Sequence, residues 1–475
     1  MSNLKSYVIH TIGGGWGKET IEENLIKVSV IRGTDFPKLE KLDFSSVPIR
    51  FETLKKIESR TLQVGDLIIE VSGGSASSGQ RTGRCLYITQ EILDNLGKYV
   101  IPASFCRLLR LDKEKINSKF IYYQIAEMHL SDQIGIYENQ STGISNFQFN
   151  LFLDEIFPKI TDLNKQNSIV DIFNSIDQKI QLNTQINQTL EQIAQALFKS
   201  WFVDFDPVRA KVQALSDGMS LEQAELAAMQ AISGKTAEEL TALSQTQPDR
   251  YAELAETAKA FPYEMVEVDG VEVPKGWECF SLKELSSAIS KGTTPKKSSL
   301  NSCNSKGTVP FIKVKDISES GQILINQVEQ IPEKISSTEL KRSILHKNDI
   351  LISIAGTIGR VAIVPNELEN ANTNQAISFI RLYNDNLVGI ISTFLKSRKN
   401  QEDITSKVIQ GVQANISLEV VRNIKIFLPI NFDNKAILIF NSLLNKQLIS
   451  QKENLLIEKS RDLLLPNLLN GEFIR

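Results

Sequence analysis

Two long segments of the chain carry apolar residues at spacings of mostly three and four, with polar residues between them. The first segment, residues 163–203, contains no Gly or Pro. Because that spacing follows the 3.6-residue helical turn, it predicts one amphipathic helix with a single apolar stripe. Asn183 stands near the middle of the stripe, where a polar residue can fix the register of a coiled coil. The apolar positions are Ile169, Ile172, Phe173, Ile176, Ile180, Ile186, Leu190, Ile193 and Leu197.

The second segment, residues 434–469, has a similar stripe and a similar end. LEQIAQALFKSWFVD from Leu190 closes the first helix, and IEKSRDLLLPNLLNG from Ile457 has the same place in the second. A lone stripe is usually a surface helix on the core of its own domain. Two equally long stripes at equivalent positions instead favour an antiparallel pair. We therefore predict two long helices that pack on each other as a coiled coil.

Further similar segments follow one another in the same order in both halves of the chain. A single pair would be weak support, but six pairs in one order indicate an internal repeat. The pairs are LKSYVIHTIGGGWGK from Leu4 with LKELSSAISKGTTPK from Leu282, IRGTD from Ile31 with IKVKD from Ile312, VGDLII from Val64 with KNDILI from Lys347, TGRCLYIT from Thr82 with IGRVAIVP from Ile358, STGISNFQFNLFLDEIFP from Ser141 with IQGVQANISLEVVRNIKIFLP from Ile409, and IFNSIDQKI from Ile172 with IFNSLLNKQ from Ile439.

Each copy begins with a strand-rich region. Short apolar or alternating runs such as VGDLIIEV, from Val64, are separated by turn-forming stretches such as GGSASSGQ, from Gly73. The fold class that we predict is α+β, with two pseudo-repeated strand-rich domains separated by a pair of long antiparallel coiled-coil helices. The predicted parts are a first domain at 1–162, a central helix at 163–203, a connector at 204–274, a second domain at 275–430 and a C-terminal helix at 431–475.

The connector differs in composition from the rest of the chain. It holds 14 acidic and 5 basic residues, so that the net charge of −3 conceals a remainder of +6 outside it. The capping patterns Ser220 to Gln223 and Thr236 to Glu239, and Pro248 at a helix start, predict short helices. The charge outside the connector is compatible with DNA contact, although the charge alone favours a mixed solvated surface.

Composition and chemistry exclude several other classes of protein. With 41% hydrophobic and 23% charged residues, the chain can bury substantial cores, and it lacks the apolar run of roughly 20 residues that a membrane span needs. We therefore expect a cytoplasmic protein. The four cysteines have no paired spacing, so we expect them to be reduced thiols.

A search for catalytic motifs finds no active site. The three histidines lie far apart, IGGGWGKE from Ile12 lacks the residues of a P-loop, and DFDPV from Asp204 lacks those of an adenine methyltransferase motif. No glycine-rich turn indicates a site for S-adenosylmethionine or a dinucleotide. We therefore predict no catalytic residue and no metal site.

The helix end ALFKSWFVDFDPVRAK, the passage VEVDGVEVPKGWE into the second copy, the GTTPKK opening and the final LLPNLLNGEFIR resemble the specificity subunit of bacterial type I restriction-modification systems. The resemblance covers essentially the whole chain. One departure is that the first copy begins almost at its GGG loop, without a lead-in like VPKGW.

The resemblance implies a non-catalytic DNA-binding subunit. Its two target-recognition domains would each read one half of an asymmetric bipartite site on double-stranded DNA, and the helix pair would act as a ruler between them. It would work with two methyltransferase subunits, which modify adenine N6, and with restriction subunits, which translocate and cleave DNA. S-adenosylmethionine, ATP and magnesium would bind to those partners, so we expect no cofactor on this chain.

Loop position, repeat pairing and side-chain chemistry suggest which residues contact DNA. Arg and Lys read guanine or meet phosphates, while Asn and Gln read adenine. The candidates are Gly14, Trp16, Lys18, Arg32, Arg81, Arg84, Ser145, Asn146, Thr294, Lys296, Lys297, Lys313, Lys315, Arg360, Gln413 and Asn415. Phe198, Trp201 and Phe202 are candidates for partner binding, although packing within the chain would explain the same residues.

Two alternatives belong to other classes of protein. One is a divergent DNA methyltransferase or nuclease, against which stands the absence of cofactor loops. The other is a non-catalytic coiled-coil scaffold, against which stand two large strand-rich domains with polar, basic loops. Binding of S-adenosylmethionine would separate the first alternative from a specificity subunit, and binding of DNA would separate the second.

Overall fold

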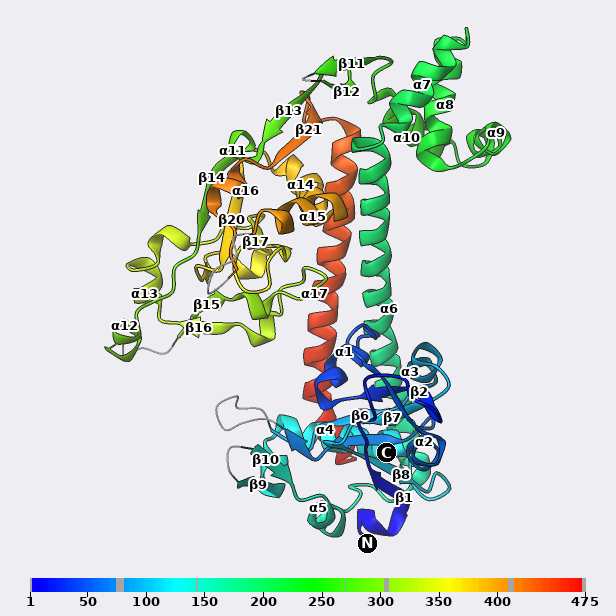
Figure 1. Ribbon diagram of the computed structural model, residues 1–475, viewed down its shortest axis with the longest axis vertical. Coiled ribbons are helices and arrows are strands. Elements are labelled where there is room, and N and C mark those ends of the chain that lie inside the picture. Colours follow the sequence, from blue (N-terminus) through cyan, green and yellow to red (C-terminus); the bar gives the residue numbers. More distant parts are fainter. Residues whose placement is uncertain are drawn as a thin grey trace. The chain divides into compact units, whose positions relative to one another are not determined.

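A computed structural model describes residues 2–73, 81–141, 144–268, 270–302, 307–408 and 414–471. The chain forms two compact units (Figure 1). Unit 1 combines Met1–Thr184 with Lys452–Arg475, and unit 2 is Gln185–Gln451. Each unit therefore contains part of both long helices. No helix in the described part of the chain is long and apolar enough to cross a membrane.

Unit 1 is built on a four-stranded antiparallel sheet in the order β1-β8-β4-β6. A second sheet has the order β3-β2-β7, in which β2 is antiparallel to β3 and parallel to β7. A third sheet, β5-β10-β9, is short. The strands are β1 (Val8–Gly13), β2 (Leu25–Ile31), β3 (Ile49–Thr53), β4 (Leu67–Glu70), β5 (Ser72–Gly73), β6 (Cys85–Tyr87), β7 (Val100–Pro102), β8 (Cys106–Leu111), β9 (Glu138–Ser141) and β10 (Ile144–Phe147). The short helices are α1 (Phe36–Leu39), α2 (Leu54–Arg60), α3 (Gln90–Leu96), α4 (Ser118–Leu130) and α5 (Phe149–Glu155).

Unit 2 repeats the two larger sheets with the same order and strand directions. Its four-stranded sheet is β14-β20-β17-β18, and its three-stranded sheet is β16-β15-β19. Even an irregularity recurs, because the first strand of each four-stranded sheet shifts register near its start, at Val8/His10 and at Ser286/Ala288. The predicted internal repeat and the α+β class are thus confirmed.

The remaining elements of unit 2 extend this plan. Strands β13 and β21 pair antiparallel, and in the sequence they stand before and after the strands of the second copy. The strands are β13 (Trp277–Ser281), β14 (Ser286–Lys291), β15 (Val309–Ile312), β16 (Glu329–Ile331), β17 (Ile350–Ser353), β18 (Val361–Ile363), β19 (Asn372–Thr373), β20 (Ile377–Leu382) and β21 (Lys425–Pro429). The helices are α11 (Leu282–Leu285), α12 (Lys297–Ser302), α13 (Glu333–Ser337), α14 (Val388–Lys396), α15 (Arg398–Ser406) and α16 (Leu418–Arg422).

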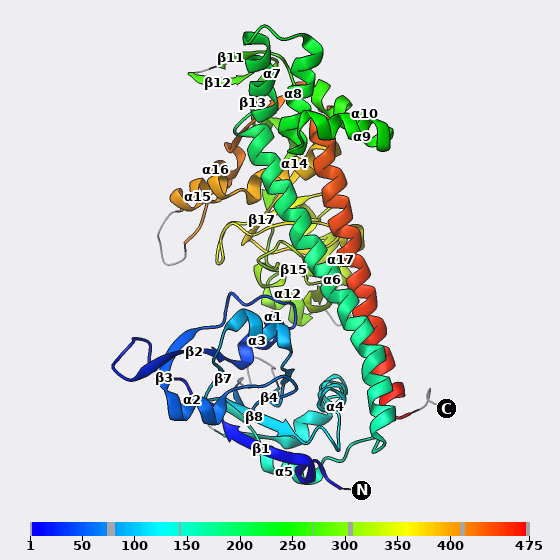
Figure 2. The same ribbon diagram turned by 90° about the vertical axis from the view of Figure 1, so that its right-hand side faces the viewer.

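The two long helices, α6 (Leu163–Phe202) and α17 (Lys435–Leu469), lie side by side and antiparallel (Figure 2). Asn183 is buried in unit 1, and its Nδ2 donates to Oδ1 of Asn454 on α17 at 2.8 Å. The Nδ2 of Asn454 in turn donates to the carbonyl of Ile180 at 3.2 Å. The polar position predicted for the helix seam is therefore confirmed, and both amides are satisfied there.

The end of each long helix completes the core of a unit. In unit 1, Leu465, Leu468 and Leu469 of α17 are buried with Phe173 of α6 and the strand residues of the first copy. In unit 2, the end of α6 packs with Phe440 of α17 and the strand residues of the second copy. The similar helix ends in the sequence thus have the same packing role.

The connector forms four helices and a hairpin within unit 2. The capping boxes predicted at Ser220 and Thr236 are both present, with each hydroxyl accepting from the N–H three residues later. A small apolar core that includes Met229 and Leu240 holds the last three of these helices together. The elements are α7 (Asp206–Ser216), α8 (Leu221–Ser233), α9 (Ala237–Thr246), α10 (Pro248–Lys259), β11 (Met265–Val268) and β12 (Val271–Pro274).

Candidate nucleic-acid interface

A glycine loop follows β1 in unit 1 and runs against the turn between β7 and β8. The N–H of Gly14 donates to the carbonyl of Cys106, and the N–H of Gly15 donates to that of Pro102, both at 2.9 Å. A Cβ added to Gly14 would lie 2.6 Å from the carbonyl carbon of Ala103 and nearer still to its oxygen. Gly14 is therefore required for the close approach of two backbones, and it brings no side chain to a ligand.

Unit 2 builds the same joint with a different sequence. The N–H of Gly292 donates to the carbonyl of Ile377 at 3.0 Å, and the N–H of Thr293 donates to that of Thr373 at 2.9 Å. A Cβ on Gly292 would overlap the carbonyl of Thr373. The pairing of Gly14 with Gly292 predicted from the repeat is confirmed as a shared structural role.

The turn between β7 and β8 is held on its other side as well. The carbonyl of Phe105 accepts from the N–H groups of Val71 and Ser72, at 2.8 and 3.3 Å. In unit 2 the carbonyl of Ala376 accepts from two consecutive N–H groups, beginning at Ile354, at the same two distances. The backbone at these turns is thus equivalent, while the side chains differ.

Two asparagines occupy equivalent positions beside these turns. Asn146 on β10 lies opposite Ser72 of β5, and Asn415 forms a bridge with Ala355. Both asparagine side chains are exposed, and Oδ1 of Asn146 accepts from the Ser72 hydroxyl at 3.0 Å. Ser145 is buried, so its predicted DNA contact would need a movement of β10.

These segments converge through the hydrogen bonds just described, and we call them the interface loops. In unit 1 they are residues 13–18, 71–73, 102–106 and 144–147. In unit 2 they are residues 291–294, 354–355, 373–377 and 414–416.

Arg32 follows β2 and is tied to its own helical turn. Its guanidinium donates to both carboxylate oxygens of Asp35, at 2.8 and 3.0 Å, and to the carbonyl of Ser46 at 2.6 Å. The hydrogen bond to Asp35 raises the pKa of Arg32, opposed by burial. Arg32 therefore shapes this loop, and its charge is largely matched by a buried acid.

The equivalent cations of unit 2 share one acid. The Nζ atoms of Lys313 and Lys315 lie 2.6 and 2.9 Å from the carboxylate of Glu329 on β16. The hydrogen bonds from these lysines lower the pKa of Glu329. The backbone N–H of Lys313 donates to Asp316, as that of Arg32 does to Asp35, so the turn is repeated although the side-chain pairing is not.

The predicted arginines before β6 are engaged within the chain. Arg84 donates to both carboxylate oxygens of Glu70, at 2.8 and 2.9 Å. Arg81 donates to Asp132 and to Glu138, each at 2.9 Å, and these hydrogen bonds raise its pKa. Either arginine would have to break its ion pair within the chain before its guanidinium could contact a base.

Arg360 is the equivalent of Arg84, and within the described part of the chain it is not paired with a carboxylate. Its Nη1 donates to the carbonyls of Ile317 and Val314, at 2.5 and 3.3 Å. The adjacent N–H of its backbone donates to the Ser353 hydroxyl. Arg360 is therefore a positive charge bound to neutral acceptors.

Trp16 and Lys18 lie at the end of the unit 1 glycine loop. The guanidinium of Arg50 lies 4.5 Å from the centroid of the exposed Trp16 ring and 3.1 Å from Glu19. The Nζ of Lys18 pairs with Glu22 at 2.5 Å. Arg50 was not predicted, because its place on β3 gave no indication that it reaches this loop.

The first residues after the unit 2 glycine loop lie in a polar stretch. The Thr294 hydroxyl donates to Oε1 of Gln375, and the backbone N–H of Lys296 donates to Glu339 at 2.9 Å. Lys297 begins α12. Gln375 was not among the predicted site residues either. A comparison of the turns that precede β8 and β20 in the two copies could have indicated it. Gln413 lies outside the described residues.

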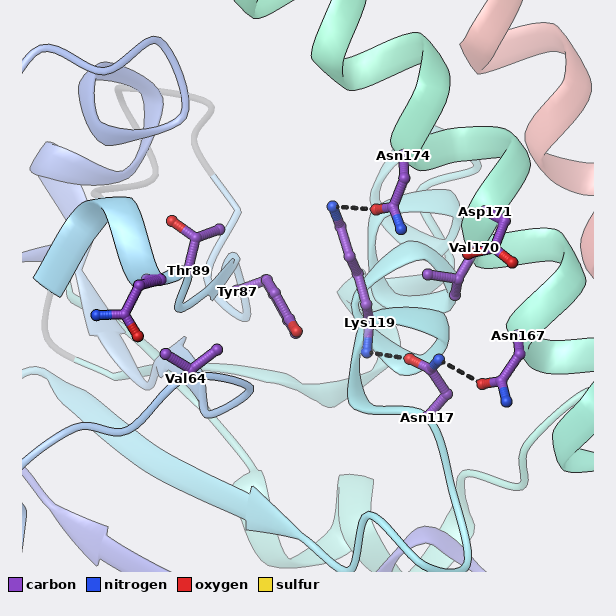
Figure 3. Close-up of a pocket in the computed structure, with 10 residues that line it drawn as sticks. Val64, Tyr87, Thr89, Asn117, Lys119, Asn167, Val170, Asp171 and Asn174 are labelled. Atoms are coloured by element: carbon purple, nitrogen blue, oxygen red, sulfur yellow. Dashed lines mark hydrogen bonds between the residues drawn. The ribbon is translucent and has the colours of Figure 1, made fainter.

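A pocket of about 410 Å³ lies in unit 1 between α4, α6 and the start of α3 (Figure 3). Lys119 donates from Nζ to Oδ1 of Asn174 at 2.6 Å, and Asn117 donates from Nδ2 to Oδ1 of Asn167 at 2.8 Å. Burial lowers the pKa of Lys119, opposed by the nearby Asp177 carboxylate. These groups satisfy one another, so the pocket serves as a polar joint between α4 and α6.

Comparisons with known proteins show the family of this chain. A family model described as the type I restriction modification DNA specificity domain matches residues 274–459. The type I restriction enzyme HindI specificity subunit of Haemophilus influenzae is 42% identical over 403 residues, covering 82% of this chain and 84% of that protein. The chain belongs to the family of type I restriction enzyme specificity subunits.

More distant similarities extend over most of this specificity subunit. The MjaIX specificity subunit of Methanocaldococcus jannaschii is 22% identical over 369 residues, covering 76% of this chain and 70% of that protein. The crystal structure of an S subunit from M. genitalium is 14% identical with a TM-score of 0.44, covering 98% of this chain and 95% of that chain.

The three aromatic residues predicted to bind partners lie inside this specificity subunit. Phe198, Trp201 and Phe202 are buried in the core of unit 2. Phe202 packs on Trp277 with ring centroids 4.9 Å apart, and Phe198 stacks on Phe202 at 5.7 Å. Packing within the chain accounts for all three, so a role in partner binding would be indirect, through the position of the helix end.

Proposed function

We propose that this chain is the sequence-specific DNA-binding subunit that directs adenine-N6 methylation and ATP-dependent restriction by partner subunits to an asymmetric bipartite DNA site. Members of this family are the non-catalytic DNA-recognition subunits of type I restriction-modification systems. Among the residues that the structure describes, no group of His, Cys, Asp and Glu is placed to hold a metal ion.

One observation carries the bipartite part of the proposal. Units 1 and 2 present the same backbone joint at the interface loops, with different side chains on it. Equivalent scaffolds suit one class of ligand, while unequal side chains suit two different sequences. Asn146 and Asn415 are the exposed pair best suited to adenine, since their amides can donate and accept at the same base edge.

The long helices support the spacer role that we propose for them. A bipartite site needs half-sites at a fixed spacing, and double-stranded DNA presents the same face about every 34 Å. The buried pair of Asn183 and Asn454 fixes the register of the helices, because any slip would leave an amide unsatisfied in the seam. The target-recognition domains at 1–162 and 275–430 would then read the two half-sites.

An exposed apolar row on α17 supports docking of methyltransferase subunits. Leu456 and Leu463 lie seven residues apart on the part of α17 that belongs to unit 1, with exposed fractions of 56% and 76%. Apolar side chains at that spacing lie along one face of a helix, as in a helical bundle. We propose that helices of the methyltransferase subunits cover this row, and that restriction subunits join through them.

In this proposal the partner subunits carry out the chemistry, so they also bind the cofactors. S-adenosylmethionine, ATP and magnesium would be bound by the partner subunits, where methyl transfer and translocation occur. The specificity subunit would bind none of them and would act in the cytoplasm. Its own contribution is to place the target adenine within reach of the subunit that flips it out.

The decisive experiment is a methylation map. The chain would be co-expressed with the methyltransferase subunit encoded beside it, in a host without adenine methylation, and N6-methyladenine would be mapped by long-read sequencing. We expect one asymmetric motif in two parts with a fixed unread gap. Exchanging residues 1–162 for the equivalent domain of another family member should change one half of the motif only.

The same experiment tests the alternative of a coiled-coil scaffold. A soluble, associated complex that methylates no motif and binds no DNA would contradict sequence recognition.

A second experiment tests the proposed α17 surface. Substituting Leu456 and Leu463 with Glu should separate the subunits, whereas the same change at the exposed Ile9 on β1 should not. Association lost equally in both variants would refute the proposed α17 surface.

A further inference from the structure

Phe105 is an exposed aromatic residue on a rigid turn in unit 1. Its side chain is 65% exposed. The backbone around it is fixed, because its carbonyl accepts two N–H groups and the N–H of Ala103 donates to the carbonyl of Ile31 at 2.8 Å. An unburied aromatic ring on a fixed backbone forgoes the stabilisation that burial would provide. Such a position is suited to a partner that covers the ring.

Small and polar residues lie next to the turn that carries Phe105. Gly14 supports the turn from one side, and Ser72 and Asn146 lie beside it. Trp16, the other exposed aromatic of these loops, is covered on one face by the guanidinium of Arg50. Among the described residues of the unit 1 interface loops, Phe105 is therefore the aromatic side chain that projects without a cation on its ring.

The equivalent residue of unit 2 lacks such a projection. Ala376 has the same two backbone hydrogen bonds at the same distances, but its side chain is a single methyl group. Thr294 and Gln375 pair with each other beside it. Any contact that depends on an aromatic ring at this point is thus available to unit 1 and not to unit 2.

We propose that Phe105 acts as a wedge that partly unstacks one base step in the half-site bound by unit 1. This inference rests on the proposed function and adds a physical difference between the half-sites. Apolar side chains that enter a base step kink the duplex, and pyrimidine–purine steps such as TA and CA yield most readily. The half-site read by unit 1 then contains such a step at the position of Phe105, selected by its deformability.

The first test measures unstacking directly. Once the methylation map has supplied the motif, 2-aminopurine is placed in turn at each position of both half-sites, and its fluorescence is read with the full methyltransferase complex. Apart from the target adenines, which the methyltransferase subunits flip out, we expect a several-fold rise at one step of the unit 1 half-site. F105A should abolish the rise, and F105L should retain part of it. F157A is the matched control, since Phe157 is 45% exposed but lies outside the interface loops.

The second test asks whether the base step and the side chain act together. Replacing the pyrimidine–purine step by its purine–pyrimidine reversal should weaken binding by the wild-type complex about tenfold, the size of one base–aromatic stack. The same replacement should have little effect on the F105A complex. Reversing a step in the unit 2 half-site should affect both proteins equally.

The outcomes separate this inference from the proposed function. A 2-aminopurine signal confined to the flipped target adenines, or a step preference that F105A leaves unchanged, would overturn the wedge while leaving sequence recognition in place. Absence of any methylated motif with wild-type protein would be seen earlier, in the map itself, and would refute both.

Discussion

Replacing Gly14 with Ala tests whether the glycine loop is a structural joint. The added Cβ would lie 2.6 Å from the carbonyl carbon of Ala103, whereas unstrained carbon atoms are about 3.5–4.0 Å apart. The loop must therefore withdraw by roughly 1 Å. That movement disrupts the hydrogen bonds from Gly14 to Cys106 and from Gly15 to Pro102, which are both 2.9 Å long.

The cost follows from the two hydrogen bonds. At about 1 kcal/mol each, with some residual strain, G14A should destabilise unit 1 by about 2–3 kcal/mol. The adjacent Gly13 is a matched control, because a Cβ there would have no heavy atom within 4 Å. G13A should change stability by no more than about 0.5 kcal/mol, as surface substitutions usually do.

The assay combines denaturant unfolding with hydrogen exchange. G14A should lower the unfolding midpoint and speed exchange at residues 13–16 and 102–106, and it should abolish methylation because one half-site is no longer read. G292A should do the same for residues 291–294 and 373–377. Equal effects of G13A and G14A, or wild-type exchange in G14A, would refute the close-approach explanation.

Three further predictions concern buried polar groups. N183L should destabilise the helix pair by about 1–3 kcal/mol, because it leaves Oδ1 of the buried Asn454 without its donor, and N183L/N454L should recover the loss. A double-mutant cycle by thermal unfolding in which the two costs simply add would contradict this. D349N should lower the free energy of unfolding of unit 2 by about 3 kcal/mol in denaturant, because Arg381 donates to both carboxylate oxygens of the buried Asp349, at 2.7 and 2.8 Å. E419Q is the control and should change it very little, because the ion pair of Glu419 with Arg422 is exposed. Burial lowers the pKa of Lys211 to about 8. Between pH 8 and about 10.4 the unfolded chain therefore binds more protons than the folded chain, and the free energy of unfolding should rise with pH. K211M should remove this part of the pH dependence when unfolding is measured across the same range.

The sequence predicted those features that depend on local pattern or on the repeat. The two long helices follow from a stripe without Gly or Pro, and the shared role of Gly14 and Gly292 follows from aligning the copies. The connector helices follow from capping residues that act within one turn.

Features that depend on distant partners could not be predicted in this way. Arg81 pairs with Asp132, 51 residues away, and no local pattern links them. The exposure of Phe105 depends on which face of a turn its side chain takes, and the alignment alone did not single it out. Trp201 could equally have faced a partner, because an apolar helix end has the same composition whether another chain or its own core covers it.

The packing of Leu465, Leu468 and Leu469 into unit 1 has a consequence for how the chain is made. Residues 185–451 leave the ribosome complete and can fold at once, although they come second in the chain. Residues 1–184 must wait for the last turns of α17 before their core can close. Unit 1 is therefore finished last, against the usual N-terminal-first order. A nascent chain stalled before residue 465 would hold one folded unit and one with exposed apolar surface, which chaperones would have to shield.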